Sequence, residues 1–200
     1  MVLDARDDSD CPTNERKGLN MPQYWNEVIG RQFVTAIQTL RNAIDACPDG
    51  LWDERTDGTP FWHIAYHALF YCDFYLSDEE KAFQAPDYHV DHNHYLPGDY
   101  KEFGGIVTTP AQCYTKQQML EYADHCTGKC RGVFEALTEQ RAKQRCGFWW
   151  YKLNVGEFLI NSLRHTQHHA AQLALILRRR ANLGVDWLGT EDNQPPPPTW

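Results

Sequence analysis

The hydrophobic residues of this chain recur at helical spacing over four long stretches. These stretches predict helices over residues 21–46, 60–77, 116–143 and 155–182. In the first stretch, one face carries Trp25, Val28, Ile29, Phe33, Ile37, Leu40 and Ile44. The second stretch is apolar on nearly every face, which is typical of a helix that is buried on all sides. The pattern therefore predicts an all-α fold.

Each predicted helix begins at residue types that favour helix starts. The start signals are Asn20 with Pro22, Thr59 with Pro60, Thr115 with Gln118, and Asn154 with Glu157. Thr115 and Gln118 have the spacing of a capping box, in which each side chain bonds to the backbone N–H of the other. Asn154 and Glu157 have the same spacing and predict a similar cap.

A long connection separates the second predicted helix from the third. Residues 77–113 contain several prolines and glycines and show no sustained period. A connection of this length would let the third helix run parallel to the second, so we predict a four-helix bundle of up-down-down-up topology. We expect this domain to span residues 20–190, between a flexible leader (1–19) and a proline-rich tail (191–200).

Composition narrows the classes of partner. The chain has 19 Lys and Arg residues against 27 Asp and Glu, a net charge of −8, and no basic stripe that would follow a nucleic acid backbone. It has no apolar run of the roughly 20 residues needed to span a membrane, and no apolar signal core near its start. Its seven cysteines include no CxxC pair, which argues against a disulfide framework and a zinc ribbon. We expect a cytoplasmic protein that binds neither nucleic acid nor membrane.

The histidines form the strongest chemical pattern. Of nine histidines, His63 and His67 fall on the second predicted helix, and His165, His168 and His169 on the fourth. Residues four apart on a helix differ by only about 40° around its axis, so His165 and His169 can converge on one point. Neutral imidazole is a ligand for Zn, Ni, Fe or Cu, and two helices could supply three nitrogens while leaving positions open for water.

Other interpretations of these histidines stay open at this point. A histidine pair one helical turn apart also arises by chance in proteins that bind no metal. Haem bound within the bundle is a further alternative. The loop histidines His89, His92 and His94 could also bind a metal, although exposed loop histidines are more often incidental.

The fourth helix resembles that of the DinB/YfiT-like superfamily of helical-bundle metalloproteins. His165, His169 and Gln172 match its H-x-x-x-H-x-x-Q motif, and Arg178, Gly184 and Trp187 match its usual ending. On the second helix, the segment from Trp62 to Leu69 is similar to the W-H-x-x-H form with one extra residue. The order of helices and the long crossover also agree with that superfamily.

The resemblance implies a site of three histidines, with His165 and His169 joined by one histidine of the second helix. We favour His67, because Asp73 follows it at the offset seen in the related domain of ergothioneine-pathway enzymes; His63 is the alternative ligand, or a group behind it. Asp73 itself is expected to be solvated or to pair helices. Gln172 is expected to orient a ligand or, as we favour, to hydrogen-bond between helices.

The resemblance also implies a function. The superfamily includes thiol-dependent transferases and isomerases, so we expect a divalent-metal-dependent enzyme of transferase or hydrolase type, with Zn or Ni first and Fe or Mn next as its metal. The substrate would be a small molecule, with a low-molecular-weight thiol as a candidate, and no catalytic residue is assigned. The alternative is a non-catalytic bundle that holds a metal or a small ligand. Independently of the resemblance, the apolar stripe of the first helix, with Tyr24, Trp25 and Phe33, could pair two subunits in a homodimer or pack in the core.

Overall fold

Four long helices form a bundle in the computed structural model, which describes residues 21–56, 58–97, 110 and 112–190. The helices in chain order are α1 (Met21–Ala46), α2 (Asp49–Trp52), α3 (Phe61–Tyr75), the 3-10 turn η1 (Glu80–Ala82), α4 (Lys116–Ala136), α5 (Glu139–Lys143) and α6 (Val155–Arg180). The described residues form no strand, which confirms the predicted all-α class. The predicted leader (1–19) and the predicted proline-rich tail (191–200) lie outside the described residues.

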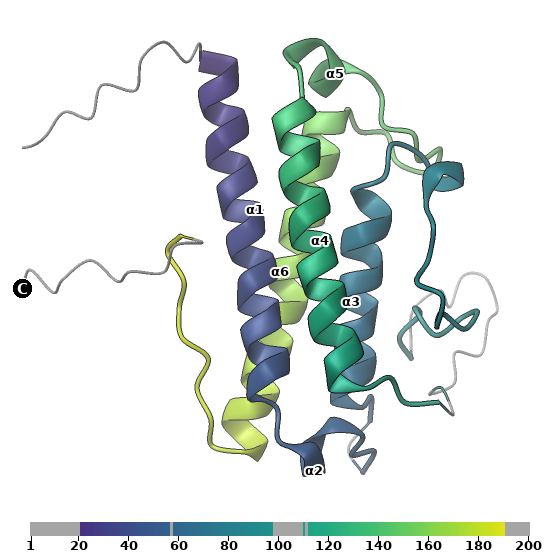
Figure 1. The fold of residues 1–200 in the computed structure, drawn as a ribbon, viewed down its shortest axis with the longest axis vertical. Coiled ribbons are helices and arrows are strands. Elements are labelled where there is room, and N and C mark those ends of the chain that lie inside the picture. Colours follow the sequence, from purple (N-terminus) through teal and green to yellow (C-terminus); the bar gives the residue numbers. More distant parts are fainter. Residues whose placement is uncertain (1–20, 57, 98–109, 111, 191–200) are drawn as a thin grey trace, which may run out of the picture.

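Among the four long helices, α1 and α3 lie diagonally across the bundle from each other. Each of these two packs against both α4 and α6, and they barely contact one another. In Figure 1, α1 and α6 run in one direction while α3 and α4 run in the other. The part of the α3–α4 connection that the structure describes descends beside α3, so this connection returns the chain to the end of the bundle where α3 began.

Two of the predicted helix starts show the expected side-chain caps, whereas α3 begins after Pro60 with no side-chain cap and Asn20 lies outside the described residues. Thr115 with Gln118, and Asn154 with Glu157, form the reciprocal capping bonds expected at the starts of α4 and α6. The single helix predicted over residues 116–143 is wrong, because α4 ends at Ala136 and α5 begins at Glu139. Leu137 adopts an extended conformation, and the Thr138 hydroxyl caps the new helix by accepting from the backbone of Arg141. A side chain that caps so well competes with continuation of the helix.

The expectation that the second predicted helix is buried on all sides is confirmed by α3. Every residue of α3 except Phe74 is buried, including His63 and His67. Polar side chains in such surroundings need hydrogen-bond or metal partners, because an unpartnered buried polar group costs folding free energy. The burial of α3 therefore directs attention to what its histidines contact.

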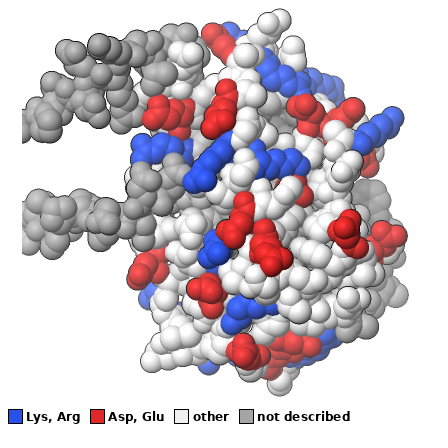
Figure 2. Space-filling view, viewed as in Figure 1, with Lys and Arg blue, Asp and Glu red and all other residues white. Residues whose placement is uncertain are grey.

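The surface of the bundle is mixed in charge and carries several exposed aromatic rings. Acidic and basic side chains are interspersed over the face drawn in Figure 2. Of the α1 residues expected to pair subunits, Phe33 is in the core while Tyr24 and Trp25 are exposed. Within the described part of the chain, no helix is both long enough and apolar enough to cross a membrane.

Candidate metal centre

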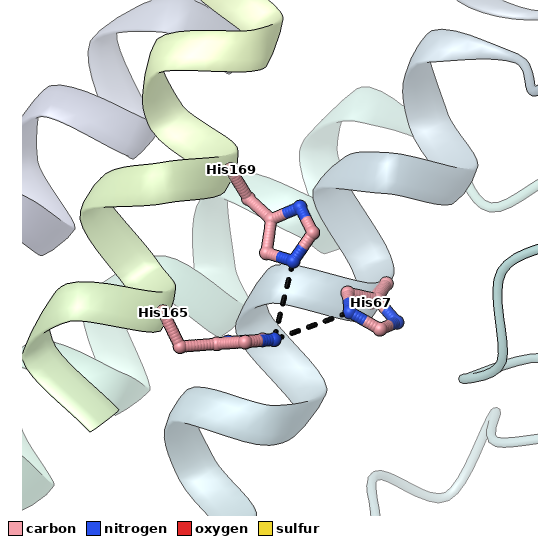
Figure 3. A group of neighbouring side chains, drawn as sticks. All are labelled: His67, His165 and His169. Atoms are coloured by element: carbon pink, nitrogen blue, oxygen red, sulfur yellow. Dashed lines mark hydrogen bonds between the residues drawn. The ribbon is translucent and has the colours of Figure 1, made fainter. Parts of the chain in front are cut away.

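Three histidines from two helices converge on one point. His67 of α3 faces His165 and His169 of α6, as Figure 3 shows. The Nε2 atom of His165 lies 3.3 Å from that of His67 and 3.1 Å from that of His169. One ligand atom from each of the three rings lies within 4.8 Å of the others. The structure thus brings together the three side chains that were favoured as ligands.

The three imidazoles are largely removed from water, and this sets their charge. His67 and His169 are buried, and His165 is half-buried. Burial, together with the neighbouring His169 and His165, lowers the pKa of His67 well below its usual value. Burial and the neighbouring His169 lower the pKa of His165 to about 3. Both rings are therefore neutral at neutral pH, which is the form that binds metal.

Two of the rings are held in one tautomer by hydrogen bonds on their outer side. His67 donates from Nδ1 to the carbonyl oxygen of His94, at 2.7 Å. His169 lies with Nδ1 at 2.7 Å from Oε1 of Gln172, whose amide nitrogen is 3.1 Å from Nε2 of His168. A carbonyl oxygen can only accept, so the protons of His67 and His169 are on Nδ1 and their Nε2 lone pairs face the centre.

This donor set fits a divalent metal ion. The Nε2 atoms of His67 and His169 are both acceptors, so only His165 can donate a proton between the three rings. That one proton cannot make good hydrogen bonds to both neighbours. A cation would satisfy all three lone pairs at once. Zinc–nitrogen bonds of about 2.0–2.1 Å in a tetrahedron imply nitrogens roughly 3.3 Å apart, close to the two separations from His165. Nitrogens this close also leave no room for a haem plane between the rings.

The other histidines considered from the sequence lie outside this group. The Nε2 atom of His63 donates to the carbonyl oxygen of Asn93, at 3.0 Å. The loop histidines were expected to be incidental, yet His94 supplies the carbonyl oxygen that orients His67. Sequence patterns gave no signal for this role, because every residue has a backbone carbonyl.

Two interpretations made from the sequence need correction. The favoured one for Gln172, a hydrogen bond between helices, is wrong: the residues it contacts through its amide, His168 and His169, are both on α6. Its spacing of three residues from His169 instead lets it orient that ring. Asp73 is not solvated, because its side chain is only 2% exposed and bonds to Lys129 and Tyr122 of α4. The alternative for Asp73, a helix-pairing residue, is the correct one.

Two tyrosine rings pack against two of the three histidines. The ring of Tyr71 is 4.9 Å from that of His67 and 5.6 Å from that of His165, and the ring of Tyr75 is 6.2 Å from that of His165. Aromatic neighbours of this kind lower the local polarity, which strengthens electrostatic interactions inside the site. A separate cavity of about 680 Å³ lies between α1, α4 and α5, and none of the three histidines lines it.

Replacing Gln172 by leucine tests whether this residue orients His169. We expect metal affinity to fall about 10- to 100-fold, because residues that hold a ligand in place usually contribute that much. Leucine keeps most of the volume, so the melting temperature of the metal-free protein should change little. Competition with a chromophoric chelator would measure the affinity, and an unchanged affinity would show that the Gln172 bond is incidental.

A comparison with known protein families gives a match over most of the chain. The family model described as the DinB superfamily matches residues 32–173, which is more than half of the chain. The matched region runs from α1 almost to the end of α6 and includes His67, His165, His169 and Gln172. No curated protein and no solved structure matches the chain significantly.

Proposed function

This chain belongs to the DinB superfamily, and from that premise we propose that it is a divalent-metal-dependent enzyme whose metal is held by His67, His165 and His169. The proposal joins a family assignment to a site whose donor atoms, tautomers and charge state all suit a metal. It is supported residue by residue by the contacts of α3 and α6.

The observation that carries the catalytic part of this proposal is the number of ligands. Among the described residues, the group contains three histidines and no fourth His, Cys, Asp or Glu. Structural zinc sites are usually closed by four protein ligands, whereas catalytic ones have three and leave a position for water or substrate. A three-histidine site is thus of the open kind.

The bound metal would supply Lewis acidity, favouring the deprotonated form of a water or thiol at neutral pH. The protein's own groups would keep the site dry and the three rings in one orientation. His94 and Gln172 bond to the Nδ1 atoms of His67 and His169. The rings of Tyr71 and Tyr75 pack against His67 and His165. We propose Zn or Ni as the first candidates, because an all-imidazole set suits these borderline metals better than Mg or Ca; Fe or Mn come next.

The substrate class we propose is a small molecule, with a low-molecular-weight thiol as a candidate co-substrate. That part rests on the resemblance to thiol-dependent members of the superfamily. The reaction would be a transfer or a hydrolysis. A general base is not assigned, because the group of ligand atoms contains no carboxylate among the described residues.

A second function, a non-catalytic metal-binding protein, is favoured by one specific observation. His67 and His169 are both almost fully buried, at 5% and 6% exposure, and the large cavity lies elsewhere. A metal so enclosed could serve stability alone, since a ligand that binds only the folded state stabilises it.

Metal analysis tests both functions, using protein purified without a nickel-affinity resin. We expect about one divalent metal ion per chain, and a lower melting temperature after chelation, because bound metal stabilises the native state. Absence of stoichiometric metal together with an unchanged melting temperature would contradict both. Turnover of a panel of thiol-conjugation and hydrolysis substrates then separates them: activity that chelation removes supports the enzyme, and a stoichiometric metal with no turnover supports the binding protein.

A further inference from the structure

A loop of residues 86–96 lies against α3 and offers it two successive backbone carbonyls. His63 donates from Nε2 to the carbonyl oxygen of Asn93 at 3.0 Å, and His67 donates from Nδ1 to that of His94 at 2.7 Å. The two histidines are one helical turn apart, so the loop receives one hydrogen bond from each of two adjacent turns. Only the second of these histidines belongs to the metal site.

The same loop is held from a second direction by Tyr114, which is fully buried. The Tyr114 hydroxyl accepts from the backbone N–H of Val90 at 3.1 Å and from the side-chain amide of Asn93 at 3.0 Å. Asn93 is therefore fixed twice, through its side chain by Tyr114 and through its carbonyl by His63. Such doubly bonded, buried groups have little freedom to move.

Ring packing holds His63 itself in place. Its imidazole is fully buried and stacks on the ring of Trp62, with centroids 5.2 Å apart. Trp62 in turn contacts the ring of Tyr114 at 5.4 Å and donates from its indole nitrogen to Asp53 at 2.7 Å. A side chain packed this tightly has one orientation, and that orientation points its Nε2 proton at the loop.

We propose that His63 is a positioning residue for His67, acting through the backbone of Asn93 and His94. The carbonyl of Asn93 belongs to the peptide plane that ends at His94, so fixing it limits the directions available to the next carbonyl. That next carbonyl, of His94, keeps the proton of His67 on Nδ1, so the lone pair of its Nε2 faces His165. The metal-binding consequence rests on the proposed function, whereas the tautomer of His67 is a property of the protein alone.

The tautomer can be measured without any metal. In metal-free protein labelled with ¹⁵N, ring chemical shifts should show His67 protonated on Nδ1. The variants His63→Leu and Tyr114→Phe should show a mixture of tautomers or exchange broadening, because each removes one attachment of the loop. His63→Gln retains an N–H donor for the carbonyl of Asn93 and should restore most of the native signal. An unchanged His67 signal in both His63→Leu and Tyr114→Phe would overturn the proposal.

Metal affinity gives a second readout. We expect His63→Leu to weaken Co(II) binding about tenfold, Tyr114→Phe to weaken it less, and His63→Gln to approach the parent protein. The visible bands of the Co(II) protein should broaden in the same order. Thr35→Val is a matched control, because it removes a buried hydroxyl from α1, far from the loop, and should leave affinity unchanged.

A variant that lacks His67 separates positioning from direct ligation. If His63 acts through His67, then His63→Leu should cause no further loss of Co(II) affinity in a His67→Ala background. A further tenfold loss in that background would mean that His63 is itself a ligand, and would overturn the proposal. Failure of the parent protein to bind any metal would instead contradict the proposed function, and the tautomer measurement would still decide the role of His63.

Discussion

Replacing His169 by alanine is expected to lower divalent-metal affinity by more than about 100-fold, since residues that merely orient a ligand already contribute 10- to 100-fold. His169 supplies one of three nitrogens, and it lies 3.1 Å from the Nε2 of its neighbour His165. Two remaining histidines on different helices would hold the ion far less firmly. Titration of metal-free protein with Zn(II) in competition with a chromophoric chelator would measure the loss.

The control for this prediction is His125→Ala. His125 is largely exposed on α4, where it lies 3.4 Å from the carboxylate of Asp73, and it takes no part in the group of three. Its replacement removes one imidazole from the chain but should leave the high-affinity site intact. Equal losses in the two variants would indicate non-specific binding to surface histidines, and unchanged affinity in His169→Ala would mean that the metal binds elsewhere.

Much of this site was predictable because it depends on local geometry. The four-residue spacing of His165 and His169 fixes their common face on any helix, and the helix itself was marked by Asn154 and Glu157 at its start. The choice of His67 over His63 did not come from spacing, which treats the two alike. It came from the family resemblance, and the structure places His67 in the group of three.

The parts that the sequence did not predict depend on contacts between distant segments. The carbonyl of His94 reaches His67 across 27 residues of chain, and no side-chain pattern encodes the direction of a backbone carbonyl. At the break after α4, the local cap by Thr138 is accompanied by a tertiary contact, in which the side-chain amide of Asn26 donates to the carbonyl of Leu137 at 2.6 Å. Such contacts override the helical periodicity that continued past this point.

The α3 helix shows how the fold and the site depend on each other. A helix buried on all sides must find partners for its polar side chains inside the protein, and those of α3 turn in two directions. His63 and His67 turn toward the loop and α6, while Asp73 turns toward α4. We therefore expect substitutions of His63 and His67 to alter metal binding, and substitutions of Asp73 to alter the free energy of unfolding.

Replacing Asp73 by alanine should accordingly lower the free energy of unfolding by about 3 kcal/mol, the lower end of the range for breaking a buried ion pair. The carboxylate of Asp73 accepts from Nζ of Lys129 at 2.5 Å and from the hydroxyl of Tyr122 at 3.0 Å. Removing it leaves the Tyr122 hydroxyl without this acceptor. The Lys129 ammonium then keeps only the backbone carbonyl of residue 73 and the hydroxyl of Ser77 as hydrogen-bond partners. The Lys129 side chain is 27% exposed and can turn partly to water, which limits the cost. Urea denaturation would measure the change.

Asp78→Ala is the control for this change in stability. A metal titration of Asp73→Ala then tests whether Asp73 also contributes to metal binding. Asp78 pairs with Arg141 at 3.0 Å, but its side chain is 85% exposed, so its loss should cost under about 1 kcal/mol. Folded Asp73→Ala protein should bind Zn(II) within about threefold of the parent, because its carboxylate contacts α4 and not the three histidines. A large loss of affinity with unchanged stability would contradict this, since it would place Asp73 in the metal site and not in the contact between α3 and α4.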